Sequence, residues 1–201
     1  WFQENIGTEY ARKAKEQGCG AFDLINADVQ KTPIGANRLI YLPYLNGERT
    51  PHVDPNCRGV FFGLSSMHTT ADMARAVMEG IQYSLTDCND IIKEMGIEVS
   101  EMMACGGGAK NAVQMMADMF GCDVKTVTAT EGPALGVAIL AGVGAGLFES
   151  VESACRQMIH TDPAKECHAD PKATAEYDKY HQIYKNLYTC LKDQFQELAK
   201  L

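Results

Sequence analysis

The sequence lacks the features that would place a protein on nucleic acid or in a membrane. It has no excess of basic residues, since 18 Lys and Arg stand against 26 Asp and Glu, for a net charge of −8. This balance disfavours a nucleic-acid backbone or an anionic membrane surface as a partner. The longest apolar stretch, residues 134–148, is too short to span a bilayer and predicts a buried helix instead.

Paired cysteine motifs are also absent. The 8 cysteines are scattered without a Cys-x-x-Cys pair, and no signal peptide precedes them. This pattern is typical of reduced, partly buried thiols in a cytoplasmic protein. Cys167, His168 and His160 fit no zinc-ligand spacing, so we expect a solvent-facing loop there and no metal site.

The chain has no initiator methionine. It begins inside a helix-like pattern over residues 1–17, with Gly18 as a plausible C-cap. We therefore expect the 201 residues to be a piece of a longer protein, long enough for one domain or for one lobe.

The first half of the chain predicts loops, two strands and a long helix. Glycine, proline and asparagine in residues 19–38 indicate a loop, and residues 38–45 and 60–64 indicate strands. Thr69 and Asp72 resemble a capping box at the start of a helix. That helix should bury one continuous stripe, formed by Met73, Ala76, Val77, Gly80, Ile81, Ser84, Leu85, Cys88, Ile92 and Met95.

The second half predicts a βαβ unit with parallel strands. Short strands over residues 102–105 and 124–128 flank a helix that Gly121 ends, and Pro133 suits the first turn of a further helix. From Lys172 onward, aromatic and aliphatic residues recur at helical spacing. This tail should form a helix that docks on the body of the protein.

The stretch "MMACGGGAKN", residues 102–111, places three glycines between a strand and a helix. Exposed N–H groups at such a junction can hold an anion or a nucleotide. The stretch is not a P-loop, because Lys110 lacks the Ser/Thr partner and the spacing, and Asn111 replaces the third glycine of a dinucleotide fingerprint. By itself a glycine run is more often a plain turn.

A second candidate is "GERTPH", residues 47–52. Arg49 could hold a phosphate or a carboxylate, but an ion pair that fastens the loop is the favoured interpretation of Glu48 and Arg49. Glu79, in the long helix, is either a buried hydrogen-bonded carboxylate or a surface residue. No catalytic triad or paired-carboxylate spacing stands out.

Two longer stretches resemble a known family. "LIYLPYLNGERTPHVDPNCRGVFFGLS", followed by "DMARAVMEGIQYSL", is similar to the C-terminal lobe of the FGGY carbohydrate kinases. The spacing of G-x-F-x-G-L and D-M-x-x-A-V-M-E, from Gly59 to Glu79, matches a signature of that family. Within the family, "PYLNGERTPH" is most similar to the xylulose kinases, and the resemblance covers nearly the whole chain.

The resemblance implies a fold and an activity. Residues 1–201 would be an α/β fragment, part of an actin/hexokinase-like (ribonuclease H-like) C-terminal lobe. The fragment would be helix-rich, with a small, partly parallel sheet that lacks its first strands. The reaction implied is ATP-dependent phosphorylation of a sugar, most similar to the conversion of D-xylulose to D-xylulose 5-phosphate. The general-base aspartate belongs to the absent N-terminal lobe, so the 201 residues alone should be inactive.

The resemblance also implies site residues and partners. A sugar and ATP would be the ligands, with Mg²⁺ held mainly through ATP and the absent lobe, and a homodimer is one assembly the protein could form. Glu48 and Arg49 would form part of the sugar-side cleft wall. The nucleotide would contact Gly106, Gly107, Gly108, Ala109 and Asn111, with Pro133 at the border of its pocket.

One departure from the family keeps alternatives open. After the glycine loop the chain is shorter than usual by roughly two residues, about half a helical turn, which puts the role of Asn111 in question. The alternatives are a non-catalytic interaction module derived from such a lobe, or a kinase for another ketose, a polyol or an aldonate. A dinucleotide-binding oxidoreductase domain is disfavoured by the missing third glycine.

Overall fold

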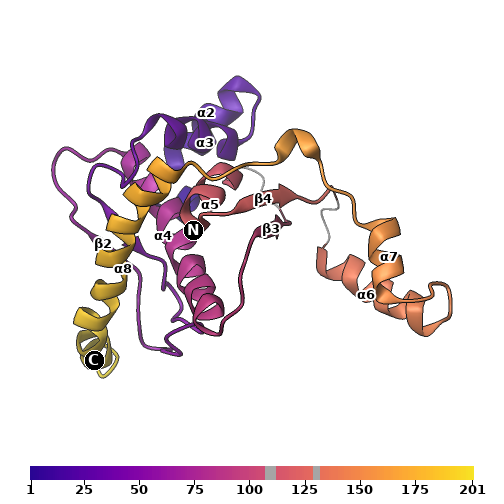
Figure 1. Cartoon of the computed structure of the whole chain (residues 1–201). Helices are drawn as coiled ribbons and strands as arrows, with labels where there is room; N and C mark the ends of the chain where they lie inside the picture. The colour runs from indigo at the N-terminus through magenta and orange to yellow at the C-terminus, as the bar shows by residue number, and fades with distance from the viewer. Residues whose placement is uncertain (107–111, 129–131) are drawn as a thin grey trace. The chain divides into compact units, whose positions relative to one another are not determined.

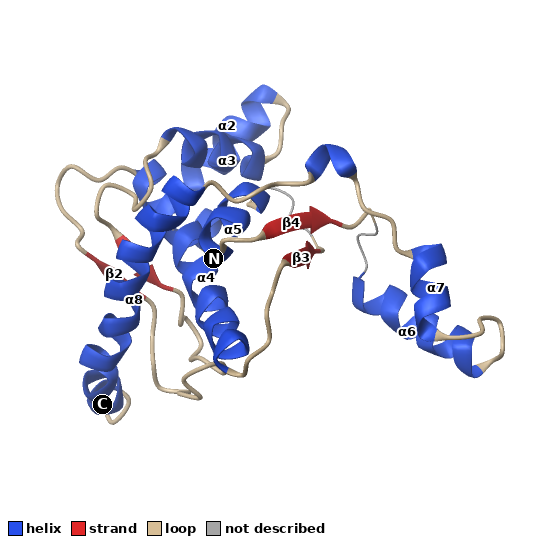
Figure 2. Ribbon diagram, viewed as in Figure 1, coloured by secondary structure: helices blue, strands red, loops and turns tan. Residues whose placement is uncertain are grey.

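Helices dominate the structure, a computed structural model that describes residues 1–106, 112–128 and 132–201 (Figures 1 and 2). The chain forms two units that are considered separately below. The first unit contains residues 1–97 and 171–201, and the second contains residues 98–170.

The first unit opens with three helices, of which the third was not predicted. Gly18 has a φ of +68° and caps the second helix, as its sequence position predicts. The loop predicted for residues 19–38 is wrong, because residues 21–31 are helical. The Asp23 carboxylate accepts the Gly20 amide at the helix start, and Ile25 and Val29 are buried. This packing outweighs the loop-like composition. The helices are α1 (Phe2–Asn5), α2 (Thr8–Gln17) and α3 (Ala21–Lys31).

A short antiparallel hairpin packs against the longest helix of the first half of the chain. Strands β1 (Ile40–Leu42) and β2 (Val60–Phe62) pair with Tyr41 opposite Phe61. Helix α4 (Thr70–Glu94) follows, and its start is the predicted capping box: Asp72 accepts the Thr69 amide, and Thr69 accepts the Asp72 amide. These two strands and this helix start are confirmed.

The continuous apolar stripe predicted for α4 is only partly buried. Ala76 and Gly80 are buried, but Ile81, Leu85 and Met95 are exposed at 45%, 44% and 71%. The buried face is instead largely polar, and α8 (Pro171–Leu198), which packs on α4, supplies hydrogen-bond partners to Arg75 and Asp87. The predicted docking of the tail helix is thus confirmed. The polar residues of α4 that are buried are Asp72, Arg75, Glu79, Gln82, Thr86, Asp87 and Asn89.

The second unit contains the predicted βαβ arrangement. Strands β3 (Glu101–Ala104) and β4 (Asp123–Thr126) are parallel, and α5 (Val113–Phe120) lies between them in the sequence. Gly121 ends α5 with a φ of +65°. The small core of the unit consists of Ala104, Val113, Ala117 and Val124.

The remaining elements of the second unit are α6 (Gly132–Gly144), α7 (Val151–Met158) and a 3₁₀ turn, η2 (Pro163–Lys165). The apolar composition of α6 predicts a buried helix, but Val137 and Leu140 are exposed at 68% and 62%. Within this chain α6 packs on α7 through one side, which includes Ile139 and Gly142. In the part of the chain that the structure describes, no helix combines the length and apolarity needed to cross a bilayer.

Candidate functional site

The carboxyl end of β3 lies beside the amino end of α6. Strand β3 leads into Cys105 and Gly106, and a Cβ atom added to Gly132 would lie 2.9 Å from the Cys105 sulfur. The Val127 amide, just after β4, donates to the Ala104 carbonyl over 3.2 Å. The glycine loop therefore starts next to a helix amino terminus, where free N–H groups and the helix dipole favour an anion.

Two of the predicted nucleotide-binding residues, Gly106 and Pro133, lie in the described part of the chain. Gly106 has a φ of +89°, and a Cβ atom added there would meet no atom of the described residues within 4 Å. Pro133 is exposed at the first turn of α6. Such open main chain fits a flat or anionic ligand that approaches the backbone. The other predicted residues, Gly107, Gly108, Ala109 and Asn111, lie outside the described residues.

The loop of residues 46–58, in the first unit, closes on itself at its base. The Glu48 amide donates to the Asp54 carbonyl at 2.9 Å, and the Asp54 amide donates to the Glu48 carbonyl at 2.8 Å. The Glu48 carboxylate accepts the Thr50 amide at 2.7 Å. Backbone and side-chain bonds thus hold the "GERTPH" sequence in one conformation.

The structure does not support the interpretation of Arg49 as an ion-pair partner that fastens this loop. Among the residues that the structure describes, Arg49 makes no salt bridge, and its side chain is exposed. Glu48 uses its carboxylate to hold the Thr50 amide instead. A guanidinium presented in this way can bind hydroxyl, carboxylate or phosphate oxygens of a ligand.

Glu79 is the buried, hydrogen-bonded carboxylate of the two alternatives that the sequence leaves open. It is 1% exposed, and its Oε1 atom accepts from Arg75 Nε at 2.6 Å and from the Gly35 amide at 3.1 Å. Arg75 also donates to the Val29 carbonyl at 3.0 Å and to the Tyr177 hydroxyl. Burial raises the pKa of Glu79, and the Arg75 guanidinium opposes that shift. The pair ties α4 to α3, α8 and the segment before β1.

His52 belongs to the 46–58 loop and packs against α8. Its ring stacks on Tyr188, with 3.5 Å between ring centroids and 10° between the planes. Its Nε2 atom is buried and has no hydrogen-bond partner in the described part of the chain. Burial lowers the pKa of His52, although the carboxylates of Asp87, Glu48 and Asp54 act in the opposite direction.

This arrangement predicts that the protein loses stability as His52 becomes protonated. The folded pKa lies below the unfolded value of about 6.5, so the unfolded state binds more protons, and stability falls as the pH drops below about 6.5. His52→Phe retains an aromatic ring for Tyr188 but removes the titration. Urea midpoints between roughly pH 7.5 and 5 should therefore fall less in this variant than in the wild type.

His168→Gln provides a contrast. Asp123 raises the pKa of His168, so this histidine stabilises the fold at low pH and loses that contribution as the pH rises through its folded pKa. Its removal should steepen the loss on acidification slightly, because the side chain is 72% exposed. If the urea midpoints of wild type and His52→Phe fall equally with pH, protonation of His52 does not contribute to the loss of stability.

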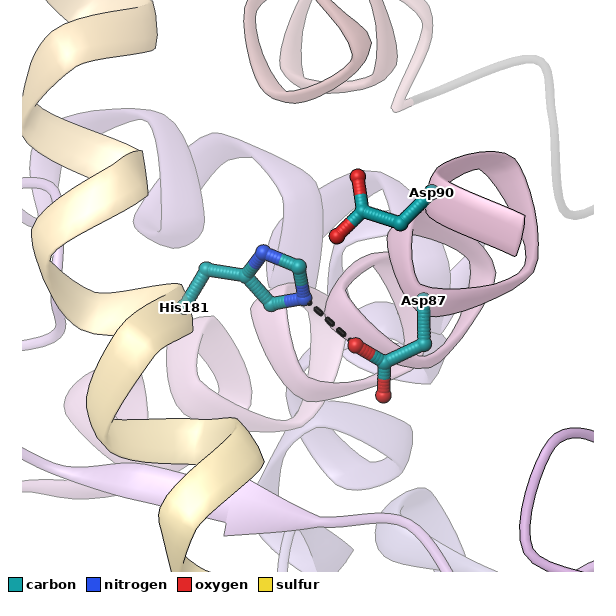
Figure 3. Close-up of side chains that lie close together, drawn as sticks. All are labelled: Asp87, Asp90 and His181. Atoms are coloured by element: carbon teal, nitrogen blue, oxygen red, sulfur yellow. Dashed lines mark hydrogen bonds and ion pairs between the residues drawn. The ribbon is translucent and has the colours of Figure 1, made fainter. Parts of the chain in front are cut away.

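Asp87, Asp90 and His181 form a cluster between α4 and α8 (Figure 3). His181 Nε2 lies 2.7 Å from Asp87 Oδ1, with both side chains buried, and Lys185 Nζ lies 3.1 Å from Asp90 Oδ2. One ligand atom from each of the three residues lies within 4.8 Å of the others, a spacing that a metal ion could bridge. The Lys185 ammonium already neutralises Asp90, so the cluster serves as a pair of interhelical contacts.

A second group of possible ligand atoms comes from Asp123, Glu166 and His168. His168 Nδ1 lies 3.0 Å from Asp123 Oδ1, and the Lys125 ammonium lies 3.9 Å from Glu166 Oε1. Of the residues weighed for a zinc site, His168 belongs to this group of described residues, whereas Cys167 and His160 do not. Exposed ion pairs of this kind contribute little stability.

Sequence reasoning missed the residues that hold these features together. Asp54 lies in a stretch dense in turn residues and gives no signal of its own. Tyr184 belongs to the pattern that predicts the docking tail helix, but Tyr188 and Gln196, 4 and 12 residues further on, were not part of that pattern. Nothing in the sequence shows which segment these residues contact.

The fold defines a class: the C-terminal lobe of an actin/hexokinase-like kinase. The C-terminal domain of the FGGY family of carbohydrate kinases matches residues 1–145. The chain is 43% identical over 157 residues to a xylulose kinase of Staphylococcus epidermidis, covering 77% of this chain and 31% of that protein. The chain therefore belongs to the FGGY family of carbohydrate kinases.

Two solved structures share the fold. Ligand-bound xylulose kinase from Lactobacillus acidophilus has a TM-score of 0.79 at 30% identity, over 96% of this chain and 39% of that one. Gluconate kinase from the same organism has a TM-score of 0.78 at 32% identity, over 89% of this chain and 36% of that one. The chain thus spans about a third of the length of the relatives it matches.

Proposed function

We propose that this chain supplies part of the ATP-binding lobe of a kinase that transfers the γ-phosphoryl group of ATP to a sugar hydroxyl. Membership in the FGGY family supports this proposal. The observation that carries it in the structure is the open main chain at Gly106, beside the amino end of α6. We further propose D-xylulose as the acceptor, because the "PYLNGERTPH" sequence is most similar to that of xylulose kinases and the S. epidermidis relative is one.

In this proposal the chain contributes positioning and electrostatics. Gly106 begins a backbone surface, continued by Gly107, Gly108, Ala109 and Asn111, against which the adenosine and α-phosphate lie. Pro133 borders the same pocket, and Glu48 and Arg49 line the sugar side. Mg²⁺ would be held through the ATP phosphates and through the rest of the enzyme, where the general-base aspartate also belongs. Phosphoryl transfer depends mainly on such alignment of donor and acceptor.

The acceptor can be identified with a coupled ADP-release assay of the full-length protein. The panel should contain ketoses, polyols and aldonates, with gluconate included because of the similar gluconate kinase structure. D-xylulose should give the highest kcat/KM. Preference for an aldonate would refute the xylulose assignment, and the absence of acceptor-dependent ADP release would refute the kinase assignment.

A matched pair of glycine variants tests the nucleotide site. Gly106 and Gly146 have φ values of +89° and +75°, and in the part of the chain that the structure describes neither has an atom within 4 Å of an added Cβ. Valine should therefore strain the backbone similarly at both positions. Only Gly106→Val should obstruct ATP, weakening ADP binding by about tenfold or more in a calorimetric titration. Equal ADP affinity in the two variants would place the nucleotide elsewhere.

A further inference from the structure

The buried carboxylate of Asp54 makes several of the contacts between the 46–58 loop and α8. Asp54 is 5% exposed, and its Oδ2 atom accepts from the Tyr188 hydroxyl at 3.1 Å. Its Oδ1 atom accepts from Gln196 Nε2 at 3.1 Å and from the Asn56 amide at 2.9 Å. These bonds hold the pKa of Asp54 below its ordinary value in spite of burial, which acts in the opposite direction. The carboxylate is therefore charged and fully engaged at neutral pH.

The same face of α8 provides further contacts to this segment. Asn56 Nδ2 donates to Gln196 Oε1 at 2.7 Å, which makes Gln196 a bridge between two residues of the loop. Tyr188 stacks on His52, and the Tyr184 hydroxyl lies 2.9 Å from the Tyr44 hydroxyl. The α8 residues involved, 184, 188 and 196, are spaced by multiples of four and lie along one side of the helix.

The attachment reaches the tip of the loop through the backbone of Asp54. Its amide and carbonyl pair with the carbonyl and amide of Glu48, so the residue that carries the buried carboxylate is bonded directly to Glu48. Beyond this pairing His52 packs on Tyr188, whereas Arg49 and Thr50 are exposed and Val53 is 76% exposed. The loop is therefore held at its base and at His52, and it presents Arg49, Thr50 and Val53 to solvent.

We propose that α8 positions the acceptor-side tip of this loop, with Tyr188 and Gln196 as the positioning residues. This inference rests on the proposed function, in which Glu48 and Arg49 contact the sugar. In this role Tyr188 and Gln196 act through Asp54, to which both are bonded, and not on the sugar or ATP. They fix the Asp54 carboxylate, and Asp54 fixes Glu48 and the direction in which Arg49 leaves the loop.

The test uses steady-state kinetics of the full-length enzyme with Gln196→Ala and Tyr188→Phe. Each variant should raise the KM for the sugar by about fivefold to tenfold, because losing a hydrogen bond to Asp54 leaves Glu48 and Arg49 less well positioned for the sugar. The KM for ATP and kcat should change by less than about twofold. Gln196→Glu should have a larger effect than Gln196→Ala, since it places a second carboxylate against Asp54.

Two control variants lie on the same helix. Gln194→Ala removes an exposed glutamine two positions from Gln196, and Tyr180→Phe removes a tyrosine hydroxyl two turns before Tyr188. Both should retain the wild-type KM for the sugar. Hydrogen exchange provides an independent measure: the amides of Glu48 and Asp54 should exchange about tenfold faster in Gln196→Ala and not in the controls.

The possible outcomes separate the two proposals. A wild-type protein that releases no ADP with any sugar would refute the proposed function. Active variants with an unchanged sugar KM would refute the positioning role alone. A lower kcat together with higher KM values for both the sugar and ATP, and a lowered melting temperature, would show that α8 only stabilises the fold. This outcome would also refute the positioning role.

Discussion

Gly80→Ala should destabilise the protein by about 3 kcal/mol or more. A Cβ atom at this position would lie 2.1 Å from the Tyr41 carbonyl oxygen, because α4 crosses β1 there at very short range. The obstructing atom is backbone and belongs to a buried strand, so it cannot move away as a flexible side chain would. Urea unfolding of the protein, with the midpoint converted to a free energy of unfolding, measures the effect.

Gly136→Ala is the matched control. Gly136 lies within a helix, α6, and a Cβ atom added there meets nothing within 4 Å. Alanine should stabilise this exposed helical position by about 0.5–1 kcal/mol, because it restricts the unfolded chain and favours the helix. Alanine variants of similar stability at the two positions would show that α4 and β1 are not in close contact.

Arg75→Met should cost about 3–5 kcal/mol, because it leaves the Glu79 carboxylate buried without its counter-charge. The Arg75 and Glu79 side chains are 9% and 2% exposed, and Arg75 also satisfies the Val29 carbonyl. The double variant Arg75→Met/Glu79→Leu should recover part of this loss, since neither of the two positions then carries a buried charge. Calorimetric unfolding of the wild type, both single variants and the double variant gives the coupling between the two residues.

A second arginine offers the comparison. Arg12 and Glu16 form an ion pair of the same i,i+4 type in α2, at 2.8 Å, but their side chains are 64% and 60% exposed. Arg12→Met should change stability by less than about 1 kcal/mol. Similar losses at Arg12 and Arg75 would mean that burial is not what makes the Arg75–Glu79 pair important.

The sequence predicted much of the local structure because the signals were local. The Thr69–Asp72 capping box, the glycine C-caps at Gly18 and Gly121 and the βαβ pattern each depend on residues close together in the chain. The prediction for residues 19–38 was wrong because tertiary packing outweighs the local preference of glycine, proline and asparagine for loops. Ile25 and Val29 have a place against the rest of the first unit, and that burial makes α3 favourable.

The candidate site was predictable to a different extent in each unit. Residue chemistry singled out the glycine loop and the "GERTPH" sequence, the resemblance to the FGGY family assigned them nucleotide-side and sugar-side roles, and the structure shows open main chain at Gly106. The interpretation of Arg49 as an ion-pair partner was wrong, because Glu48 bonds to a backbone amide that no residue pattern reveals. Four of the predicted nucleotide residues, Gly107, Gly108, Ala109 and Asn111, lie outside the described residues, so their role remains a prediction.

The sequence by itself determined the family and the order of most elements, since both are recorded in short motifs and in the spacing of apolar residues. Only the tertiary structure decided which side of α4 is buried. Periodicity places Ile81 and Leu85 on one stripe, but burial requires a neighbouring element. Helix α8, roughly ninety residues further along the chain, packs instead on the side of α4 that carries Glu79, Asp87 and other polar residues. Arg75 and Asp87 find partners there in Tyr177 and His181, and such long-range pairing leaves no periodic trace in the sequence.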